Sequence, residues 1–230
     1  MTRAWQVVDR VDGPDGRLEL RRRGDRDFLI ALDGRVLMNA AASRSEEALG
    51  RVAAESTAGS ESPRLLIGGL GMGFTLRAAL DALPNDARVL VAEIEPAVVR
   101  WCEGPLAPLT NTALADPRVE VAITDVAEPI RASRGRFHAL ALDLYAGVRP
   151  PKPGVPDPHY GDEALGALRR ALRADGAFAR WCEQADPAFE RRLARAGFSF
   201  ECRRAGRGGR RHCVYLARPK PRGARGPGLG

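Results

Sequence analysis

The sequence lacks the features that mark membrane, secreted and zinc-binding proteins. It has no run of about 18 apolar residues, so no transmembrane helix is expected. The first residues, MTRAWQVVDRVDG, have no apolar core of the kind that a secretory signal requires. The four cysteines are scattered and form no CxxC pair, which argues against a zinc cage and favours free thiols. We therefore expect a cytoplasmic protein that binds no metal.

Lysine is nearly absent, and yet the chain is basic. Only two of the 36 basic residues are lysines, and the formal net charge is +7. Residues 201–230 carry nine basic side chains against one acidic, whereas residues 1–200 carry 27 basic against 28 acidic. The excess charge therefore belongs to the terminal segment, whose stretch RRAGRGGRR contains no aromatic residue for stacking on bases. We expect no specific nucleic-acid partner.

Different sequence patterns divide the chain into three parts. Residues 1–42 consist of short alternating segments between Gly and Asp turns, which predict a small antiparallel β region. Residues 43–218 alternate strands with helices, including one helix over 161–176, and end in an antiparallel pair. This alternation predicts an α/β, Rossmann-like methyltransferase fold with a mixed, mostly parallel doubly wound sheet. Residues 219–230 are rich in Pro, Gly and Arg and predict a disordered basic tail.

Glycines and a glutamate follow the first two strands of the predicted parallel sheet. Gly69, Gly71 and Gly73 lie between a strand and a helix, where glycine permits a tight turn and the close approach of a ligand. A tight turn without a ligand is the simpler interpretation of these glycines alone. Glu93 ends the next strand, twenty residues after Gly73, where a carboxylate can accept both hydroxyls of a ribose. The alternative is a solvated strand end.

Aspartates follow the third and fourth strands. Asp125 is placed to accept an adenine amino group, to cap the helix that follows it, or to do both. Asp143 ends the fourth strand, and ligands of open parallel sheets bind at the carboxyl ends of the strands. Together with Glu93 and the glycines, these residues indicate an adenosine ligand such as S-adenosylmethionine. A pyrophosphate dinucleotide is the rival, but it leaves Asp125 without a role.

The same residues resemble the spermidine synthase family, whose members transfer an aminopropyl group from decarboxylated S-adenosylmethionine. The segment LIGGLGMGFTLRAAL is similar to the family's glycine motif, VAEIEP to its ribose-binding segment, and DPRVEVAITDVAE to its adenine-binding segment. The resemblance implies that Glu93 and Ile94 lie at the ribose and that Asp125 and Val126 lie at the adenine. It also implies assembly as a homodimer.

The segments that act on the amine differ from the family pattern. The aspartate of the family's GGGDGG motif, which holds the aminopropyl ammonium, has no counterpart in GGLGMGF. The family's D-S-S-D segment is replaced by DLYAG, which keeps Asp143, introduces Tyr145 and loses the second aspartate. Glu46 and Glu47 occupy the positions of the family's Gln/His–Glu pair. A doubly charged diamine needs paired carboxylates, so these changes weaken the implied reaction.

From these changes we expect methyl transfer from S-adenosylmethionine to a small-molecule or peptide acceptor, with Asp143 as the base and Tyr145 and Tyr160 beside it. Methyl transfer depends mostly on positioning, so one base suffices. The alternative is aminopropyl transfer from decarboxylated S-adenosylmethionine, and a further alternative is a non-catalytic adenosyl-binding protein. Tyr160 alternatively packs in the core. His159 alternatively acts as a base or is solvated, and Asp157 alternatively replaces the missing carboxylate.

Overall fold

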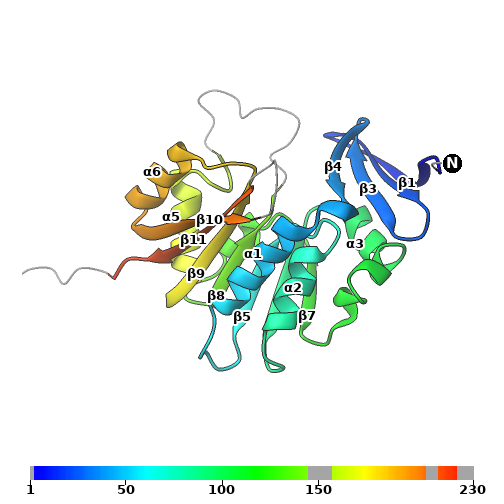
Figure 1. The fold of residues 1–230 in the computed structure, drawn as a ribbon. Coiled ribbons are helices and arrows are strands. Elements are labelled where there is room, and N and C mark those ends of the chain that lie inside the picture. The colour runs from blue at the N-terminus through cyan, green and yellow to red at the C-terminus, as the bar shows by residue number, and fades with distance from the viewer. Residues whose placement is uncertain (1–2, 145–156, 206–211, 222–230) are drawn as a thin grey trace, which may run out of the picture.

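The computed structural model describes residues 3–144, 157–205 and 212–221. It contains two sheets, a small antiparallel one and a larger one covered by helices on both faces (Figure 1). The strands of the small sheet are paired in sequence order: β1 (Gln6–Gly13), β2 (Gly16–Arg23), β3 (Asp27–Leu32) and β4 (Arg35–Asn39). Asp33 and Gly34 join the last two strands with φ values of 47° and 79°, as a tight hairpin turn requires.

The larger sheet has seven strands in the order β10-β11-β9-β8-β5-β6-β7. All of its pairings are parallel except those of β11, which is antiparallel to both β9 and β10. This mixed, mostly parallel sheet confirms the predicted fold. The strands are β5 (Arg64–Gly68), β6 (Arg88–Glu93), β7 (Val119–Ile123), β8 (Phe137–Leu142), β9 (Leu172–Cys182), β10 (Phe198–Ala205) and β11 (His212–Pro219).

The strand order reverses between β5 and β8. From β5 the chain proceeds outward through β6 and β7, and it then returns to β8 on the other side of β5. Ligands of open α/β sheets bind at the carboxyl ends of the strands at such a switch point. The topology therefore places the ends of β5 and β8, followed by Gly69 and Asp143, at the favoured position for a ligand.

The core lies in two layers, one on each face of the sheet. Leu65 and Ile67 of β5 face one layer and Leu66 faces the other, as the alternation of a strand requires. Helices α1 (Arg44–Glu55), α2 (Phe74–Ala82) and α3 (Pro96–Glu103) cover the first face, and α4 (Ala127–Arg131), α5 (Asp162–Ala171) and α6 (Pro187–Arg195) cover the second. Three short 3-10 helices complete the described elements: η1 (Ala40–Ala42), η2 (Ala107–Leu109) and η3 (Ala113–Ala115).

The helix predicted over 161–176 is shorter in the structure. It ends at Ala171, and β9 begins at the next residue. The N–H groups of Gly135 and Arg136 donate to the carbonyl oxygens of Arg170 and Ala171, at 2.8 Å each. Backbone pairing with the turn before β8 thus ends the helix, and the prediction of its end at Gly176 was wrong.

The small sheet packs against α3 (Figure 1). The indole Nε1 of Trp101 on α3 donates to Oδ2 of Asp9 on β1, at 2.7 Å. The buried side chains of Leu20 and Phe28 join the same core layer as Trp101. The small sheet is therefore continuous with the core of the larger sheet on this face.

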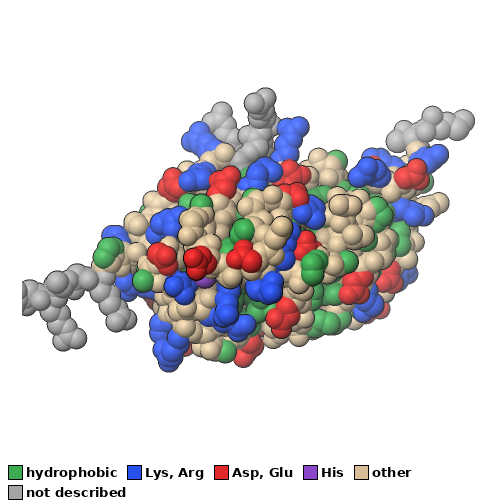
Figure 2. All heavy atoms as spheres, turned by 90° about the horizontal axis from the view of Figure 1, so that it is seen from below, with side chains coloured by type: hydrophobic (Ala, Val, Ile, Leu, Met, Phe, Trp, Pro, Cys, Tyr) green, Lys and Arg blue, Asp and Glu red, His purple; other side chains and the backbone are tan. Residues whose placement is uncertain are grey.

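The surface carries mixed charge. Basic and acidic side chains are interspersed on the face shown in Figure 2, in agreement with the near balance of residues 1–200. In the described part of the chain, no helix has the length and apolar character needed to cross a membrane. The four cysteines are free thiols. Lys220 of the predicted tail donates its N–H to Gly197, and residues 222–230 lie outside the described residues.

Candidate active site

The glycine loop between β5 and α2 lies against the ends of β6 and β8, the two strands that flank β5. Gly69, Gly71 and Gly73 have φ values of 83°, 54° and 83°, which side chains disfavour. The N–H of Gly69 donates to the carbonyl oxygen of Ala92 on β6, at 2.9 Å. A Cβ on Gly69 would overlap the carbonyl oxygen of Asp143 after β8. Glycine at this position therefore lets the loop approach the switch point.

Glu93 ties the glycine loop to the end of β6. Its side chain is buried, and Oε2 accepts the N–H of Leu70 at 2.7 Å while Oε1 accepts the N–H of Glu95 at 2.9 Å. The solvated strand end is thus excluded. Each carboxylate oxygen retains a second acceptor position, which leaves capacity for ribose hydroxyls. Ile94, the next residue, is 69% exposed and presents an apolar side chain at the same strand end.

Asp125 lies two residues before the short helix α4 and contacts a histidine. Its Oδ1 accepts the N–H of Ala127 at 2.9 Å and lies 2.9 Å from Nε2 of His159. Burial raises the pKa of Asp125, but the hydrogen bonds from Ala127 and His159 outweigh burial and lower the pKa below its usual value. Asp125 is therefore ionised at neutral pH. Its helix-capping interaction is present, and His159 contacts this carboxylate and is not free in solvent.

An apolar crevice adjoins Asp125 and His159 between α4 and α5. It is lined by Ala127, Ile130, Arg131, Leu142, Pro158, His159, Ala164, Ala167 and Leu168. Val126 is buried, and a Cβ on Gly68 would come within 2.7 Å of its Cγ2 atom. Val126 thus packs under the end of β5, beside the crevice.

Asp143 lies at the switch point itself. Its N–H donates to the carbonyl oxygen of Gly68 at 3.0 Å, which continues the pairing of β8 with β5. Burial raises the pKa of Asp143 to about 7, the negative charge of Glu46 adds to this effect, and a hydrogen bond with Thr75 opposes it. A carboxyl group with a pKa near neutrality is suited to act as a general base at physiological pH.

The two tyrosines predicted near Asp143 have different outcomes. Tyr145 lies outside the described residues. Tyr160 is buried, with the guanidinium of Arg180 3.8 Å from its ring centroid and the ring of Phe189 at 5.8 Å. Burial raises the pKa of Tyr160 above its usual value, so the phenol keeps its proton. These are packing contacts, and a catalytic role for either tyrosine stays a prediction.

Asp157, which was predicted as an alternative second carboxylate, has local partners in the structure, and its role stays a prediction. Oδ1 of Asp157 accepts the N–H groups of His159 and Tyr160, at 2.9 Å each, and this closes a local turn. The carboxylate whose charge acts on Asp143 is Glu46, in the first turn of α1. No spacing along the chain links Glu46 to Asp143, because their relation depends on how α1 packs. In the described residues, no group of three or more His, Cys, Asp or Glu side chains is arranged to hold a metal ion.

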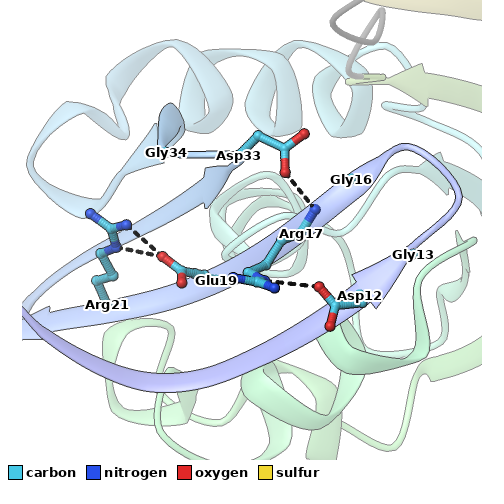
Figure 3. A pocket seen from close by; sticks show the side chains of 8 residues that line it. All are labelled: Asp12, Gly13, Gly16, Arg17, Glu19, Arg21, Asp33 and Gly34. Carbon is cyan, nitrogen blue, oxygen red and sulfur yellow. Dashed lines mark hydrogen bonds and ion pairs between the residues drawn. The ribbon is translucent and has the colours of Figure 1, made fainter.

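A separate hollow lies on the small sheet (Figure 3). It is lined by Asp12, Gly13, Gly16, Arg17, Glu19, Arg21, Asp33 and Gly34. Its charged side chains pair with one another: Arg17 Nε donates to Asp12 at 2.9 Å, and Arg21 Nε donates to Glu19 at 2.8 Å. These pairs satisfy the charges of the hollow internally, and no predicted site residue lies there.

Comparison with known proteins relates the chain to one group of enzymes, although no family model matches it. Over 116 residues it is 36% identical to polyamine aminopropyltransferase 1 of Hyperthermus butylicus, covering 49% of this chain and 38% of that protein. Over 120 residues it is 28% identical to polyamine aminopropyltransferase of Clostridium tetani, covering 52% of this chain and 41% of that protein. The matched region thus spans less than half the length of these relatives.

Solved structures agree with this relationship at the level of the fold. Spermidine synthase from Thermotoga maritima matches with a TM-score of 0.70 and 21% identity, over 94% of this chain and 73% of that one. The chain therefore has a spermidine synthase-like fold. A spermidine synthase in complex with the transition state analogue AdoDATO matches this spermidine synthase-like chain with the same TM-score of 0.70.

The comparisons correct the predicted reaction. Methyl transfer from S-adenosylmethionine was the main prediction, and it is wrong, because the matched relatives are named polyamine aminopropyltransferases. The prediction rested on the missing carboxylate of the glycine loop and the missing second aspartate after Asp143. The negative charge of Glu46 on α1, outside both segments, contributes to the raised pKa of Asp143. The carboxylates of the glycine loop and of the segment after Asp143 were therefore not sufficient to choose between methyl and aminopropyl transfer.

Proposed function

We propose that the spermidine synthase-like chain transfers the aminopropyl group of decarboxylated S-adenosylmethionine to a small amine. The observation that carries this proposal is Asp143, a carboxyl group with a pKa of about 7 at the switch point, beside a glycine loop and two further acidic strand ends. The names of the matched relatives support the same reaction. The donor, the acceptor and assembly as a homodimer all belong to the proposal.

The donor's nucleoside is bound by the ends of β6 and β7 in this proposal. Glu93 uses its remaining acceptor positions for the ribose hydroxyls, and Asp125 accepts the adenine amino group. The exposed side chain of Ile94 provides apolar contact for the base. The sulfonium then lies near the glycine loop, where Gly69 permits close approach to Asp143.

The reaction is a displacement at the carbon bonded to sulfur. The acceptor is an ammonium ion at neutral pH, and Asp143 takes one of its protons. The freed nitrogen lone pair attacks the aminopropyl carbon, the C–S bond breaks, and its electrons return to sulfur, which leaves as the neutral thioether 5′-methylthioadenosine. An alkylammonium has a pKa of about 10. Raising the pKa of the base to about 7 therefore reduces the difference in pKa between the proton donor and its acceptor.

A turnover assay tests the proposal directly. The full chain is incubated with a linear diamine and either decarboxylated S-adenosylmethionine or intact S-adenosylmethionine, and products are identified by mass spectrometry. We expect 5′-methylthioadenosine and an aminopropylated amine from the decarboxylated donor only. Separately, 5′-methylthioadenosine at about 100 times its dissociation constant should stabilise the fold by about 2.7 kcal/mol. The absence of both turnover and stabilisation would contradict the proposal.

A further inference from the structure

We propose that Glu46 binds the primary ammonium group of the aminopropyl donor and makes the site selective for the decarboxylated donor. Glu46 thereby supplies, from α1, the carboxylate that the glycine loop lacks. This inference rests on the proposed function and deepens it, because it assigns donor selectivity to one residue.

The packing of α1 on α2 fixes the position of Glu46. Thr75, the second residue of α2, is buried and donates its hydroxyl to the carbonyl oxygen of Glu46, at 3.2 Å. One turn further along α1, a Cβ on Gly50 would overlap the carbonyl oxygen of Thr75. Glycine at this position allows the two helices to touch, and it holds Glu46 beside the start of α2, directly after the glycine loop.

The same threonine connects Glu46 to the base. Thr75 lowers the pKa of Asp143 and the charge of Glu46 raises it, so both residues act on the same carboxyl group. Residues from α1, α2 and the end of β8 thus meet at one point. Two carboxylates in such proximity repel each other, and a cation bound beside them relieves this repulsion.

Glu46 and its neighbour Glu47 differ in their partners. Glu47 accepts the hydroxyl of Ser43 at 2.8 Å and pairs with Arg51 at 3.7 Å. The carboxylate of Glu46 accepts only the hydroxyl of the buried Ser45, at 2.6 Å, and within the described part of the chain it has no ion pair. One glutamate of the pair therefore already has a cation, whereas the other has a held carboxylate with acceptor positions left for a ligand.

The charge of Glu46 distinguishes the two possible donors. Decarboxylated S-adenosylmethionine ends in an ammonium group alone, which the carboxylate attracts. Intact S-adenosylmethionine carries a carboxylate beside its ammonium, and Glu46 repels that group. The bound ammonium also neutralises Glu46, which favours the ionised form of Asp143 that the reaction needs.

Calorimetric titration of three nucleosides against three proteins tests the inference. The ligands are decarboxylated S-adenosylmethionine, intact S-adenosylmethionine and 5′-methylthioadenosine, which lacks the ammonium; the proteins are the wild type, Glu46→Gln and the matched control Glu47→Gln. We expect Glu46→Gln to weaken the decarboxylated donor by about tenfold or more, because it removes a charge-assisted hydrogen bond. Affinity for 5′-methylthioadenosine should not change, and discrimination against the intact donor should shrink. Glu47→Gln should resemble the wild type.

The other outcomes overturn the inference in distinguishable ways. Equal losses for the decarboxylated donor and 5′-methylthioadenosine in Glu46→Gln would show a structural role. Unchanged affinities throughout, or a loss confined to the Michaelis constant of the acceptor amine, would show that Glu46 does not hold the donor. If the wild type binds none of the three nucleosides, the proposed function itself fails.

Discussion

Carboxylates on the two sides of the site are held in contrasting ways. On the nucleoside side, Glu93 and Asp125 accept backbone N–H groups at 2.7–2.9 Å, and Asp125 has a lowered pKa. On the amine side, Asp143 and Glu46 have hydroxyl partners, and the pKa of Asp143 is raised to about 7. Hydrogen bonds from the backbone fix a carboxylate as a permanent anion, whereas burial beside another anion prepares it to take a proton.

Replacing the base should give the largest effect and should affect only the amine side. Asp143→Asn removes the proton acceptor but keeps the shape, so we expect the turnover rate to fall by about 10²- to 10⁴-fold. The affinity for 5′-methylthioadenosine should stay within about twofold of the wild type. Steady-state kinetics and calorimetry measure the two quantities. If the variant loses both turnover and affinity for 5′-methylthioadenosine, Asp143 also affects nucleoside binding, and the two sides of the site do not act independently.

Replacing the main anion of the nucleoside side should reverse this pattern. In Glu93→Gln one oxygen becomes an amide donor, so either the Leu70 or the Glu95 N–H loses its acceptor. Leaving a buried donor unpaired costs about 1–3 kcal/mol, and we expect a comparable loss of 5′-methylthioadenosine affinity, about tenfold. The matched control is Glu95→Gln, because an amide oxygen can still accept the N–H of Ala97. If the control loses as much affinity, the effect belongs to the loop and not to Glu93.

The pH dependence should report on the amine side alone. Catalysis requires ionised Asp143, whose pKa of about 7 is raised, so kcat/KM should fall as the pH drops through about 7. In Glu46→Gln a negative charge is lost, the pKa of Asp143 falls, and the acid limb should move to lower pH. If kcat/KM instead falls only near the ordinary aspartate pKa of about 3.9, Asp143 does not differ from the other carboxylates in the way we propose. Because the raised pKa also means that ionisation opposes folding, stability from this group is lost as the pH rises through about 7.

The smallest effect is expected from the histidine of the nucleoside side. His159→Ala removes one hydrogen bond from Asp125 and should weaken 5′-methylthioadenosine binding only about two- to fivefold. His159→Gln keeps a side-chain donor and should restore part of the loss. Calorimetry across both variants measures the difference. A larger loss than that of Glu93→Gln would mean that His159 itself contacts the base.

The sequence was sufficient to predict the candidate residues that lie at the ends of parallel strands. Gly69, Glu93, Asp125 and Asp143 were predicted to converge because parallel strands bring their carboxyl ends to one edge, and the structure places them there. The strand alternation was also sufficient to predict the mixed sheet and the small antiparallel region. These features depend on local pattern and on chain topology, which a single sequence contains.

The remaining features depend on packing between distant segments. Gly50 lets α1 touch α2 and thereby places Glu46 beside Thr75, and no motif records that contact. His159 meets Asp125 across 34 positions of sequence. The end of α5 was missed because it is decided by pairing with the turn at Gly135 and not by the helix's own residues. The predicted reaction was wrong for another reason, because the matched relatives are named polyamine aminopropyltransferases.

The contact at Gly50 has a consequence for how such a site changes over time. In the proposed function, the segment that selects the donor, 44–50, precedes the segments that recognise the nucleoside, 68–73, 93–94 and 125–127. Substitutions can therefore alter the charge at position 46, or shift α1 through Gly50, without changing the segments that are proposed to bind adenosine. Donor choice in this architecture is a modular trait, encoded in the surface of one helix.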